Sequence, residues 1–362
     1  MSPLDYPALA RSQDQDAELK DSLQHGSALR LERVHIPGTD VSLYCDTSTS
    51  QPRPFTTTPF RRQVFDTLHG FSHSGANATV KLVSQRFVWP GVGKDCRAWT
   101  RACTPCQRSR VTRHVKAPLG SFNLPSARFS HVHVDLVGPL PVSSAFRYCL
   151  TAIDRYTRWP EAVPLSDITA EAVVKAFVSV WVARFGCPQQ TTTDQGRQFK
   201  ARLFKTLATI TSSSLIRTTA WHPASNGMIE RPHRQLKAAL MCHADENWAE
   251  ALPLVQLGIR SAWKEELKVS SAQLVYGSPL QLPGDFFAHS PAACTDVTDF
   301  VSQLRVHIGK LRPRTSIPAC CAIRLYFQGP GHHLACLSTA WCLPGALQAP
   351  YVGPYRVLHR SD

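Results

Sequence analysis

The sequence of 362 residues predicts an α/β fold in which a sheet of mixed strand direction is covered by helices. Several short segments in the middle of the chain alternate apolar and polar residues or are rich in β-branched residues, as strands are. Other segments repeat apolar residues at helical spacing. Strand-like segments come first and then alternate with helical ones, an order typical of α/β domains. A hydrophobic content of 43% permits at least one buried core, and the length allows two or three domains.

Three strands are predicted where this region begins. In residues 131–137 apolar residues alternate with polar ones until Gly138 and Pro139 stop the strand. Residues 148–154 and 159–165 also read as strands. We interpret the three segments as the first strands of one sheet.

The remaining elements of the region alternate in type. Thr169 can cap a long helix over residues 170–185, whose apolar residues recur at helical spacing and whose end is marked by Gly186. A β-prone run follows at 190–193. The further predicted elements are a helix at 199–210, a strand at 215–219, and helices at 230–244 and 248–263.

Three carboxylates are the candidate catalytic residues. Asp135 lies near the middle of the first strand, Asp194 directly follows the β-prone run, and Glu230 lies where a polar, glycine-containing loop leads into a helix. Strand, strand end and helix start can converge on one point. Thirty-five residues lie between Asp194 and Glu230, a spacing that is a signature of polynucleotidyl transferases. DNA strand joining is therefore the leading hypothesis.

The chemistry of phosphodiester transfer explains why carboxylates are grouped. Two divalent cations about 3.5 to 4 Å apart can stabilise both ends of an in-line displacement. Mg²⁺ prefers oxygen ligands and keeps several waters, so a few carboxylates and a substrate phosphate suffice. Each acid taken alone is more simply a helix cap, an ion-pair partner or a loop residue. The three together favour a metal site.

A second group of residues lies upstream. His69 and His73 are four positions apart, which places two imidazoles one turn apart on a helical face. After twenty-nine further residues, Cys103 and Cys106 supply two thiolates at the spacing of a zinc knuckle. Four such ligands close a tetrahedral site, so the expected Zn²⁺ is structural. An isolated Cys-x2-Cys is also a redox motif, but the paired histidines favour zinc.

The other ten cysteines form no regular disulfide pattern. The chain begins without a hydrophobic signal segment, so we expect reduced thiols in an intracellular protein. No apolar run is long enough to span a bilayer. We therefore expect no membrane partner.

Charge is distributed unevenly along the chain. Residues 1–60 hold five Lys and Arg against eight Asp and Glu, whereas residues 61–130 hold twelve against two and supply most of the net charge of +14. Basic charge around a zinc-binding module favours binding to a polyanion. The same composition is also typical of a solvated basic surface, or of a segment that becomes ordered only in a complex. The predicted DNA contacts just after the second cysteine are Arg108, Arg110, Arg113 and Lys116.

Short strings in a fixed order carry a family resemblance. They are LHGFSH at 68–73, RFVWPG at 86–91, CTPCQR at 103–108, HVDLVGPL at 133–140, IDRYTRW at 153–159, TDQGRQF at 193–199, and WHP at 221–223 through ER at 230–231. With these strings, residues 61 to about 280 resemble the integrases of gypsy-type LTR retrotransposons, which are related to retroviral integrases.

The resemblance implies a ribonuclease-H-like mixed sheet flanked by helices, preceded by a small helical HHCC zinc-binding domain and followed by a small β-barrel that binds DNA. Together with composition, it predicts the following organisation: a polar, largely irregular connector at 1–60, left from a longer polyprotein; the HHCC zinc-binding domain at 61–117; a linker at 118–129; the catalytic core at 130–285; a helical connector at 286–315; and a degenerate or truncated C-terminal DNA-binding domain at 316–362.

The resemblance also implies roles for single residues. Asp135 would bridge two Mg²⁺ or Mn²⁺ ions, while Asp194 would hold one and Glu230 the other. The enzyme would trim the ends of element DNA and join the exposed 3′-hydroxyls to host DNA in the nucleus, as a homo-oligomer on paired DNA ends. Four residues around the third carboxylate are expected to hold DNA ends, although each is equally well explained as a structural or exposed residue: His222, Asn226, Arg234 and Lys237.

Two features depart from the family pattern. Pro232 stands where the family usually carries a bulky apolar residue, and it predicts a kink that would misplace Glu230, at a cost of up to about 3 kcal/mol in a helix interior. Residues 316–345 contain four cysteines and little strand alternation, although GPYRVL at 353–358 resembles the family's C-terminal motif. A pair of compensating frameshifts would explain this segment and would leave the last domain incomplete.

Three hypotheses follow from the sequence. The first is a retrotransposon integrase that is catalytic in principle. The second is a catalytically decayed or host-adopted remnant that binds zinc and nucleic acid. The third is a metal-dependent nuclease with a similar core.

Overall fold

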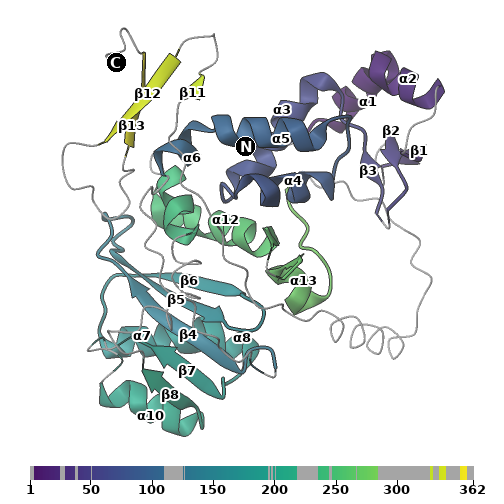
Figure 1. The fold of residues 1–362 in the computed structure, drawn as a ribbon. Coiled ribbons are helices and arrows are strands. Elements are labelled where there is room, and N and C mark those ends of the chain that lie inside the picture. The colour runs from purple at the N-terminus through teal and green to yellow at the C-terminus, as the bar shows by residue number, and fades with distance from the viewer. Residues whose placement is uncertain are drawn as a thin grey trace, which may run out of the picture. The chain divides into compact units, whose positions relative to one another are not determined.

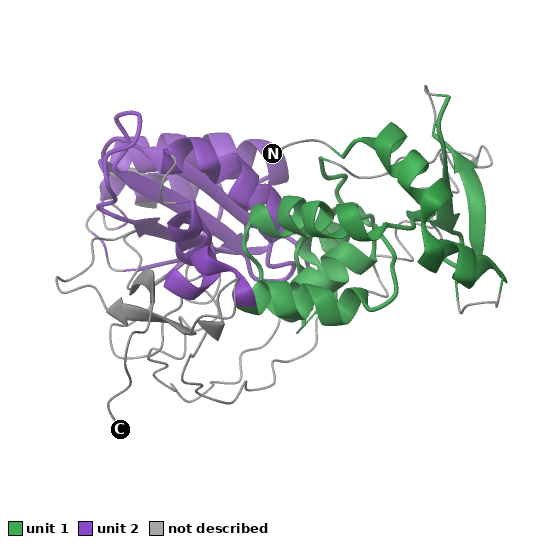
Figure 2. Ribbon diagram, turned by 90° about the horizontal axis from the view of Figure 1, so that it is seen from above, with its two compact units in different colours: residues 1–101, 261–312 green, residues 102–260, 313–362 purple. Residues whose placement is uncertain are grey.

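The computed structural model describes residues 4–24, 29–36, 40–49, 51–109, 125, 127–194, 196, 199, 201–217, 235–243, 247–265, 267–283, 327–328, 334–339 and 351–356. Contacts divide the chain into two compact units (Figure 2): residues 1–101 with 261–312, and residues 102–260 with 313–362. Within the described ranges, no helix is long and apolar enough to cross a membrane.

The N-terminal part of the first unit is folded. Two helices, α1 (Tyr6–Gln15) and α2 (Ala17–Gln24), precede a small antiparallel sheet. Its strands are β1 (Leu31–His35), β2 (Ser42–Asp46) and β3 (Arg53–Pro54), in the order β1-β2-β3.

The expectation of a largely irregular connector at 1–60 is therefore wrong for the described part of this segment. Leu9 and Leu43 are fully buried in a small apolar cluster. The Gln13 side chain ties α1 to the sheet, because its Nε2 donates to the carbonyl oxygens of Tyr44 (3.1 Å) and Phe55 (2.6 Å) and its Oε1 accepts from the Tyr44 backbone N–H (2.8 Å). A few buried apolar residues and the hydrogen bonds of one buried amide hold this segment together. Its polar composition gave no indication of such a core.

Helices dominate the rest of the first unit. They are α3 (Thr58–Gly70), α4 (Ala76–Ser84) and α5 (Val92–Ala102). The Trp89 indole N–H donates to Asp95 Oδ2 at 2.9 Å, which joins the loop before α5 to its first turn. The side chains buried among these helices are mostly apolar: Val64, Phe65, Leu68, Phe71, Leu82, Val83, Phe87, Trp89 and Cys96.

A segment expected to belong to the catalytic core contacts α4 instead. The Lys81 ammonium lies 5.5 Å from the centroid of the Trp263 ring, and Arg86 Nη2 donates to the Leu280 carbonyl oxygen at 2.8 Å. Contacts group residues 261–312 with residues 1–101. The elements involved are β9 (Trp263–Lys264), β10 (Val269–Ser270) and α13 (Ser271–Tyr276).

The second unit is built on a five-stranded mixed sheet with the order β6-β5-β4-β7-β8 (Figure 1). Antiparallel pairing joins β4 to β5 and β5 to β6, whereas β4–β7 and β7–β8 are parallel. The predicted α/β class and mixed sheet are confirmed. The strands are β4 (His131–Val137), β5 (Tyr148–Asp154), β6 (Pro160–Leu165), β7 (Gln190–Thr193) and β8 (Ser214–Arg217).

The predicted helix at 170–185 forms, with one irregularity. Thr169 Oγ1 accepts from the Ala172 backbone N–H at 3.3 Å, and Gly186 ends the helix with a φ of 80°. Between these ends the hydrogen bonding widens to a π-helical turn, which the sequence pattern did not predict. The parts are α7 (Ala170–Phe177), η1 (Val178–Val182) and α8 (Ala183–Phe185), and α10 (Arg202–Ile210) packs beside α7.

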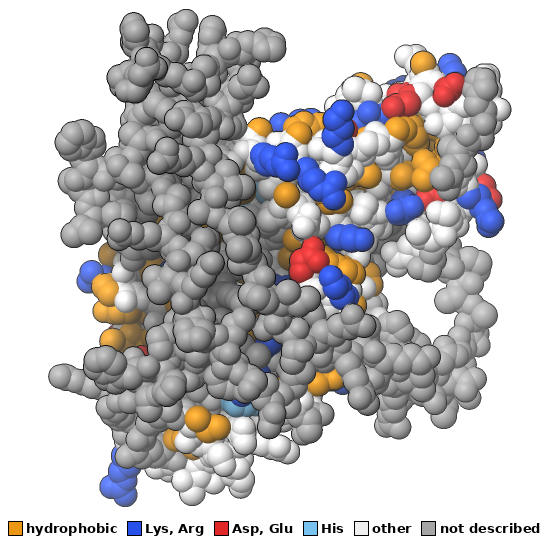
Figure 3. Space-filling view, in the orientation of Figure 1, with side chains coloured by type: hydrophobic (Ala, Val, Ile, Leu, Met, Phe, Trp, Pro, Cys, Tyr) orange, Lys and Arg blue, Asp and Glu red, His pale blue; other side chains and the backbone are white. Residues whose placement is uncertain are grey.

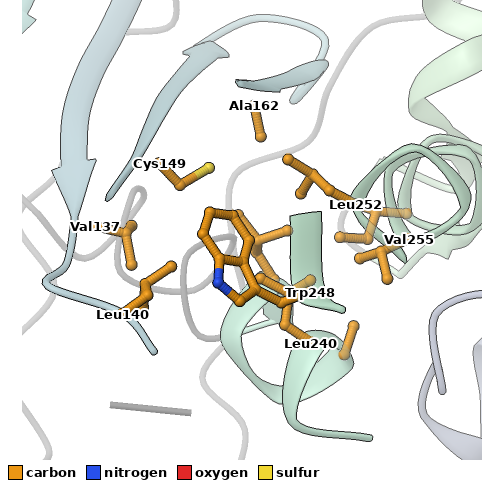
Figure 4. Close-up of a cluster of buried hydrophobic side chains, with 11 residues drawn as sticks. Val137, Leu140, Cys149, Ala162, Leu240, Trp248, Leu252 and Val255 are labelled. Carbon is orange, nitrogen blue, oxygen red and sulfur yellow. The ribbon is translucent and has the colours of Figure 1, made fainter. Parts of the chain in front are cut away.

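Helical residues 235–242 and α12 (Trp248–Ser261) pack on the sheet through the cluster in Figure 4. The Trp248 indole lies among the apolar side chains and donates to the Pro141 carbonyl oxygen at 2.7 Å. The Gln256 amide donates to the Ala162 carbonyl oxygen at 2.7 Å. This face of the sheet is also the face of Val137, and by strand alternation that of Asp135.

The backbone near the C-terminus forms a three-stranded antiparallel sheet in the order β11-β12-β13. Its strands are β11 (Phe327–Gln328), β12 (Leu334–Thr339) and β13 (Tyr351–Arg356). The first four residues of the motif, Gly353 to Arg356, lie in β13. The expectation of little strand structure in 316–345 does not hold for β12. The expected connector at 286–315 lies outside the described residues.

Candidate catalytic and metal-binding sites

Two of the three candidate catalytic carboxylates lie on neighbouring strands, Asp135 within β4 and Asp194 directly after β7. Val134 of β4 pairs with Thr193 of β7 in parallel register. Asp135 and Asp194 each follow one residue later. Adjacent strands lie about 4.8 Å apart. The two carboxylates therefore occupy equivalent positions on neighbouring strands, toward the carboxyl-terminal ends of these strands.

Backbone N–H groups hold one oxygen of each carboxylate. Asp135 Oδ1 accepts from the Leu136 N–H at 2.8 Å, and Asp194 Oδ1 accepts from the Gly196 N–H at 2.9 Å. Asp135 is half-buried and Asp194 is exposed. Fixed oxygen donors that solvent can reach are the ligands that Mg²⁺ and Mn²⁺ take. The pair therefore fits a divalent ion at this edge.

Two buried histidines precede Asp135 on the same face of β4. The rings of His131 and His133 are stacked, with centroids 4.9 Å apart, and His131 Nε2 lies 2.8 Å from Thr192 Oγ1. Burial and the nearby Arg155 guanidinium lower the pKa of His131 to about 4. A stacked imidazole pair, in which the low pKa of His131 keeps that ring neutral near pH 7, thus lies behind the carboxylates, and only the i, i+2 alternation of the strand hinted at it.

Glu230 lies outside the described residues, as do His222, Asn226, Arg234 and the proline at 232. The predicted kink at Pro232 therefore stays a prediction. Lys237 is described and lies exposed on the helical residues 235–242.

The four predicted zinc ligands come together. The ligand atoms of His69, His73, Cys103 and Cys106 all lie within 4.8 Å of one another. His69 lies near the end of α3, and Cys103 precedes α6 (Thr104–Arg108), whose first turn carries Cys106. Two imidazoles and two thiols are a donor set that Zn²⁺ binds tetrahedrally.

Thr79 sets the orientation of the first imidazole, and sequence reasoning did not identify it. Thr79 Oγ1 donates to the Ser74 carbonyl oxygen at 2.9 Å. Its oxygen can then accept from His69 Nδ1, which lies 3.1 Å away. With this arrangement the proton lies on Nδ1, and Nε2 is the nitrogen that could bind a metal ion, as in zinc sites whose histidines have outer-sphere partners.

The two histidines do not share a helix, contrary to expectation. α3 ends at Gly70, and His73 adopts a left-handed φ of 45°. The His73 N–H still donates to the His69 carbonyl oxygen at 2.8 Å. A non-helical turn thus replaces the last turn of the helix. The centroids of the two imidazole rings lie 4.9 Å apart in an edge-to-face arrangement.

A third thiol accompanies the two predicted cysteines. Hydrogen bonds with the Cys103 and Cys242 thiols, together with burial, raise the pKa of the Cys106 thiol. Thiolates in such a group need a cation to offset their repulsion and desolvation. The sequence contained no local signal for Cys242, which lies far along the chain.

Basic side chains line one side of α5. Lys94, Arg97 and Arg101 are exposed and recur at helical spacing, and Arg108 is exposed on α6. Figure 3 shows Lys and Arg side chains gathered around this part of the surface. The other predicted contacts at Arg110, Arg113 and Lys116 lie outside the described residues. Helical periodicity of the Lys and Arg residues at 94–101 was the signal that sequence reasoning missed.

Comparison with known families gives two matches. Residues 56–112 match the family described as Integrase zinc binding domain, and residues 125–223 match the Integrase core domain. The two ranges contain the four clustered His and Cys residues and the Asp135–Asp194 pair, respectively.

Several curated viral and transposon proteins are similar to this chain. The Pro-Pol polyprotein of Simian foamy virus type 3 (strain LK3) is 27% identical over 233 residues, covering 64% of this chain and 20% of that protein. The Pro-Pol polyprotein of Simian foamy virus type 1 is 28% identical over 262 residues (72% and 22%). The retrovirus-related Pol polyprotein from transposon 412 of Drosophila melanogaster is 26% identical over 270 residues (72% and 22%).

The chain spans about a fifth of the length of these relatives. Among solved structures, the catalytic core domain of BIV integrase is 18% identical, with a TM-score of 0.35, covering 40% of this chain and 93% of that chain. From the two family matches, the chain carries a zinc-binding domain followed by a core domain of the integrase family, a family of polynucleotidyl-transferase enzymes.

Proposed function

We propose that this chain is the integrase of a gypsy-type LTR retrotransposon and part of a longer polyprotein. It trims the 3′ ends of the element's DNA and joins them to host DNA. The observation that carries this proposal is the register of β4 and β7, which brings Asp135 and Asp194 to equivalent positions at one edge of the sheet.

In this proposal three carboxylates hold two divalent ions, Mg²⁺ or Mn²⁺. Asp135, Asp194 and Glu230 would hold these ions. When bound, the ions stabilise charge on the attacking and leaving oxygens of a phosphodiester. The Leu136 N–H restrains one oxygen of Asp135, and the Gly196 N–H restrains one oxygen of Asp194. Each hydrogen bond limits the directions in which the second carboxylate oxygen can point. The exposure of Asp194 gives DNA access to this edge.

One structural Zn²⁺ is held by His69, His73, Cys103 and Cys106. The ligand atoms lie close enough for one ion, and the Thr79 hydroxyl fixes the imidazole tautomer that binding requires. The ion supplies stability to a domain whose helices are short.

DNA is the proposed partner of the basic face on α5 and α6. Lys94, Arg97, Arg101 and Arg108 present positive charge along neighbouring turns, and each neutralised phosphate releases counterions. The residues at 110–116, together with those around the third carboxylate, extend the proposed DNA path. Two paired DNA ends need more than one catalytic site, so the active form is a homo-oligomer acting in the nucleus.

A strand-transfer assay tests the proposal. The full chain is incubated with labelled duplexes carrying the element's terminal sequence, a supercoiled target plasmid, and Mg²⁺ or Mn²⁺. We expect end trimming and then labelled joined products that require the metal. The Asp194→Asn variant is the negative control.

Other outcomes separate the remaining hypotheses. DNA binding without trimming or joining would identify a zinc and nucleic-acid-binding remnant, whether decayed or adopted by a host. Cleavage of unrelated DNA without joining would identify a nuclease. Either result would overturn the proposed integrase activity.

A further inference from the structure

A buried hydrogen bond joins the two strands that position the candidate catalytic carboxylates. His131 Nε2 of β4 lies 2.8 Å from Thr192 Oγ1 of β7, and both side chains are buried. Asp135 follows His131 by four positions, and Asp194 follows Thr192 by two. Because side chains at even spacing share a face of a strand, this hydrogen bond lies on the face of the sheet that carries Asp135.

The partners of the His131 ring define its tautomer. Arg155 Nη1 lies 3.4 Å from His131 Nδ1, and a guanidinium only donates hydrogen bonds. Nδ1 is therefore the acceptor, and in the neutral ring the proton lies on Nε2, which donates to Thr192 Oγ1. The His133 ring, stacked with its centroid 4.9 Å away, restrains the plane of the His131 ring. The donor that reaches β7 is thus held in place from two sides.

The sequence of β7 does not by itself specify how this strand pairs with β4. Three of the four residues in Gln190–Thr193 are threonines, and a strand without apolar and polar alternation has a weakly specified register. A shift of β7 by one residue would turn its side chains to the opposite face. A shift by two residues would keep the face but move Asp194 by about 7 Å along the strand, away from its position beside Asp135.

Each threonine of β7 has a different hydrogen-bond partner. Thr191 Oγ1 lies 3.0 Å from Ser213 Oγ, directly before β8. Thr193 Oγ1 donates to the Asp194 carbonyl oxygen at 3.1 Å. Of the three hydroxyl contacts, the one made by Thr192 reaches β4. This contact distinguishes the observed register from a shifted one.

We infer that His131 and Thr192 are positioning residues for the proposed pair of divalent ions, because their hydrogen bond holds β7 on β4 in the register that brings Asp135 and Asp194 together. This inference rests on the metal-dependent activity of the proposed function. It adds two buried residues to the carboxylates and assigns them no contact with metal or DNA.

The test uses the full chain with zinc bound and the labelled DNA ends of the strand-transfer assay. Thr192→Val keeps the branched shape and removes the hydroxyl, whereas Thr192→Ser keeps the hydroxyl. We expect Thr192→Val to raise the Mn²⁺ concentration for half-maximal joining by about five- to tenfold, with an unchanged KM for DNA. The serine variant should stay within about twofold of the wild type.

Two measurements without DNA accompany the activity assay. Electron paramagnetic resonance of free Mn²⁺ gives the affinity for the ion, which should fall in Thr192→Val by the same factor as the half-maximal concentration rises. Amide hydrogen exchange of a peptide spanning Gln190–Thr193 reports how firmly β7 is paired. Exchange should be faster in Thr192→Val than in the wild type or the serine variant.

Thr191→Val is the matched control. Thr191 is a buried threonine of the same strand, and its hydroxyl contacts Ser213 rather than β4. Its replacement removes a comparable hydrogen bond, so we expect a similar loss of melting temperature. The affinity for Mn²⁺ should not change.

A second pair of variants tests the other side of the hydrogen bond. His131→Leu has no donor, whereas the amide of His131→Gln can donate to Thr192 and accept from Arg155. The leucine variant should behave as Thr192→Val does, and the glutamine variant should restore most of the metal affinity. This pair decides the question if circular dichroism shows that Thr192→Val does not fold.

Three results overturn the inference. The first is an unchanged Mn²⁺ affinity in folded Thr192→Val or His131→Leu. The second is a loss of affinity that serine at 192 and glutamine at 131 do not restore. The third is an equal loss in Thr191→Val, which would attribute the effect to the general stability of β7. A wild-type chain that neither binds Mn²⁺ nor joins DNA would refute the proposed function and this inference with it, whereas a wild type that does both tests the inference alone.

Discussion

Asp135 and Asp194 each lie one residue beyond the parallel pair formed by Val134 and Thr193. The pairing joins strands that are separated in sequence by two further strands and a long helix. Every carboxylate-dependent property of the proposed site depends on this register, because a shift of one residue would turn one of the two side chains to the opposite face.

The first prediction concerns these two carboxylates. Asp135→Asn or Asp194→Asn should reduce metal-dependent strand transfer by on the order of a thousandfold or more. The melting temperature should not fall by more than about 2 °C, because asparagine can still accept the Leu136 or Gly196 N–H bond. Glu171→Gln serves as the control, since Glu171 is an exposed acid on α7. Retained joining by both variants would exclude the site.

The second prediction concerns the hydroxyl behind the zinc site. Thr79→Val should lower zinc affinity by roughly tenfold, because it removes the acceptor that holds the proton on His69 Nδ1. Thr79→Ser keeps the hydroxyl and should bind zinc almost as the wild type does. Competition with a chromogenic chelator measures both. Equal affinities in the valine and serine variants would show that the hydroxyl does not orient the imidazole.

The third prediction is a pH dependence of stability from His131. Its folded pKa of about 4 is below the ordinary value of 6.5, because burial and Arg155 disfavour the charged form. Above pH 6.5 the imidazole is neutral in both states. As the pH falls from 6.5 to 4, only the unfolded chain takes up the proton, so stability is lost across this window, by no more than about 3 kcal/mol.

Urea unfolding at pH 7.0, 5.5 and 4.5 measures this loss. His131→Gln should flatten the dependence, since an amide does not titrate there and can keep a bond to Thr192. His35→Gln, at an exposed histidine of β1, should leave the profile as it is. A profile of His131→Gln that parallels the wild type would assign the acid sensitivity to other groups.

The fourth prediction concerns the turn after β4. Gly138 has a φ of 148°, and a Cβ there would lie 2.5 Å from Tyr148 Cδ1 and 2.9 Å from the Arg147 carbonyl oxygen. Gly138→Ala should therefore destabilise the core by about 1–3 kcal/mol. Gly186→Ala is the comparison, because its φ is 80° but no atom lies within 4 Å of its Cβ position. Calorimetry should show the larger loss at Gly138; the reverse order would be inconsistent with the contact.

The fifth prediction concerns the basic face of α5. Single replacement of Lys94, Arg97 or Arg101 by Ser should weaken binding to DNA of any sequence. Each replacement should reduce the magnitude of the slope of log affinity against log salt concentration by about the contribution of one phosphate contact. Lys175→Ser, at an exposed position on α7, should leave the slope unchanged. Fluorescence anisotropy across a salt series gives these slopes, and unchanged slopes in all three variants would remove α5 from the DNA path.

Local features of the fold were predictable because neighbouring residues encode them. Alternation located β4, the segments 148–154 and 159–165 were read as the strands that became β5 and β6, a β-prone run located β7, and Thr169 and Gly186 marked the ends of the long helix. Spacing alone also selected the four residues whose ligand atoms cluster. A helical spacing was nevertheless the wrong reason for pairing His69 with His73, because the chain turns after Gly70.

Long-range packing decided the rest. The sequence by itself determined the strands, the helix ends, the carboxylates and the potential zinc ligands, since each depends on residues close together in the chain. Only the tertiary structure placed Asp135 beside Asp194, Thr79 against His69, and Cys242 against Cys106. It also revealed the folded N-terminal module and the contact of Trp263 with α4. These relationships depend on pairing and burial between distant segments, for which a local pattern carries no signal.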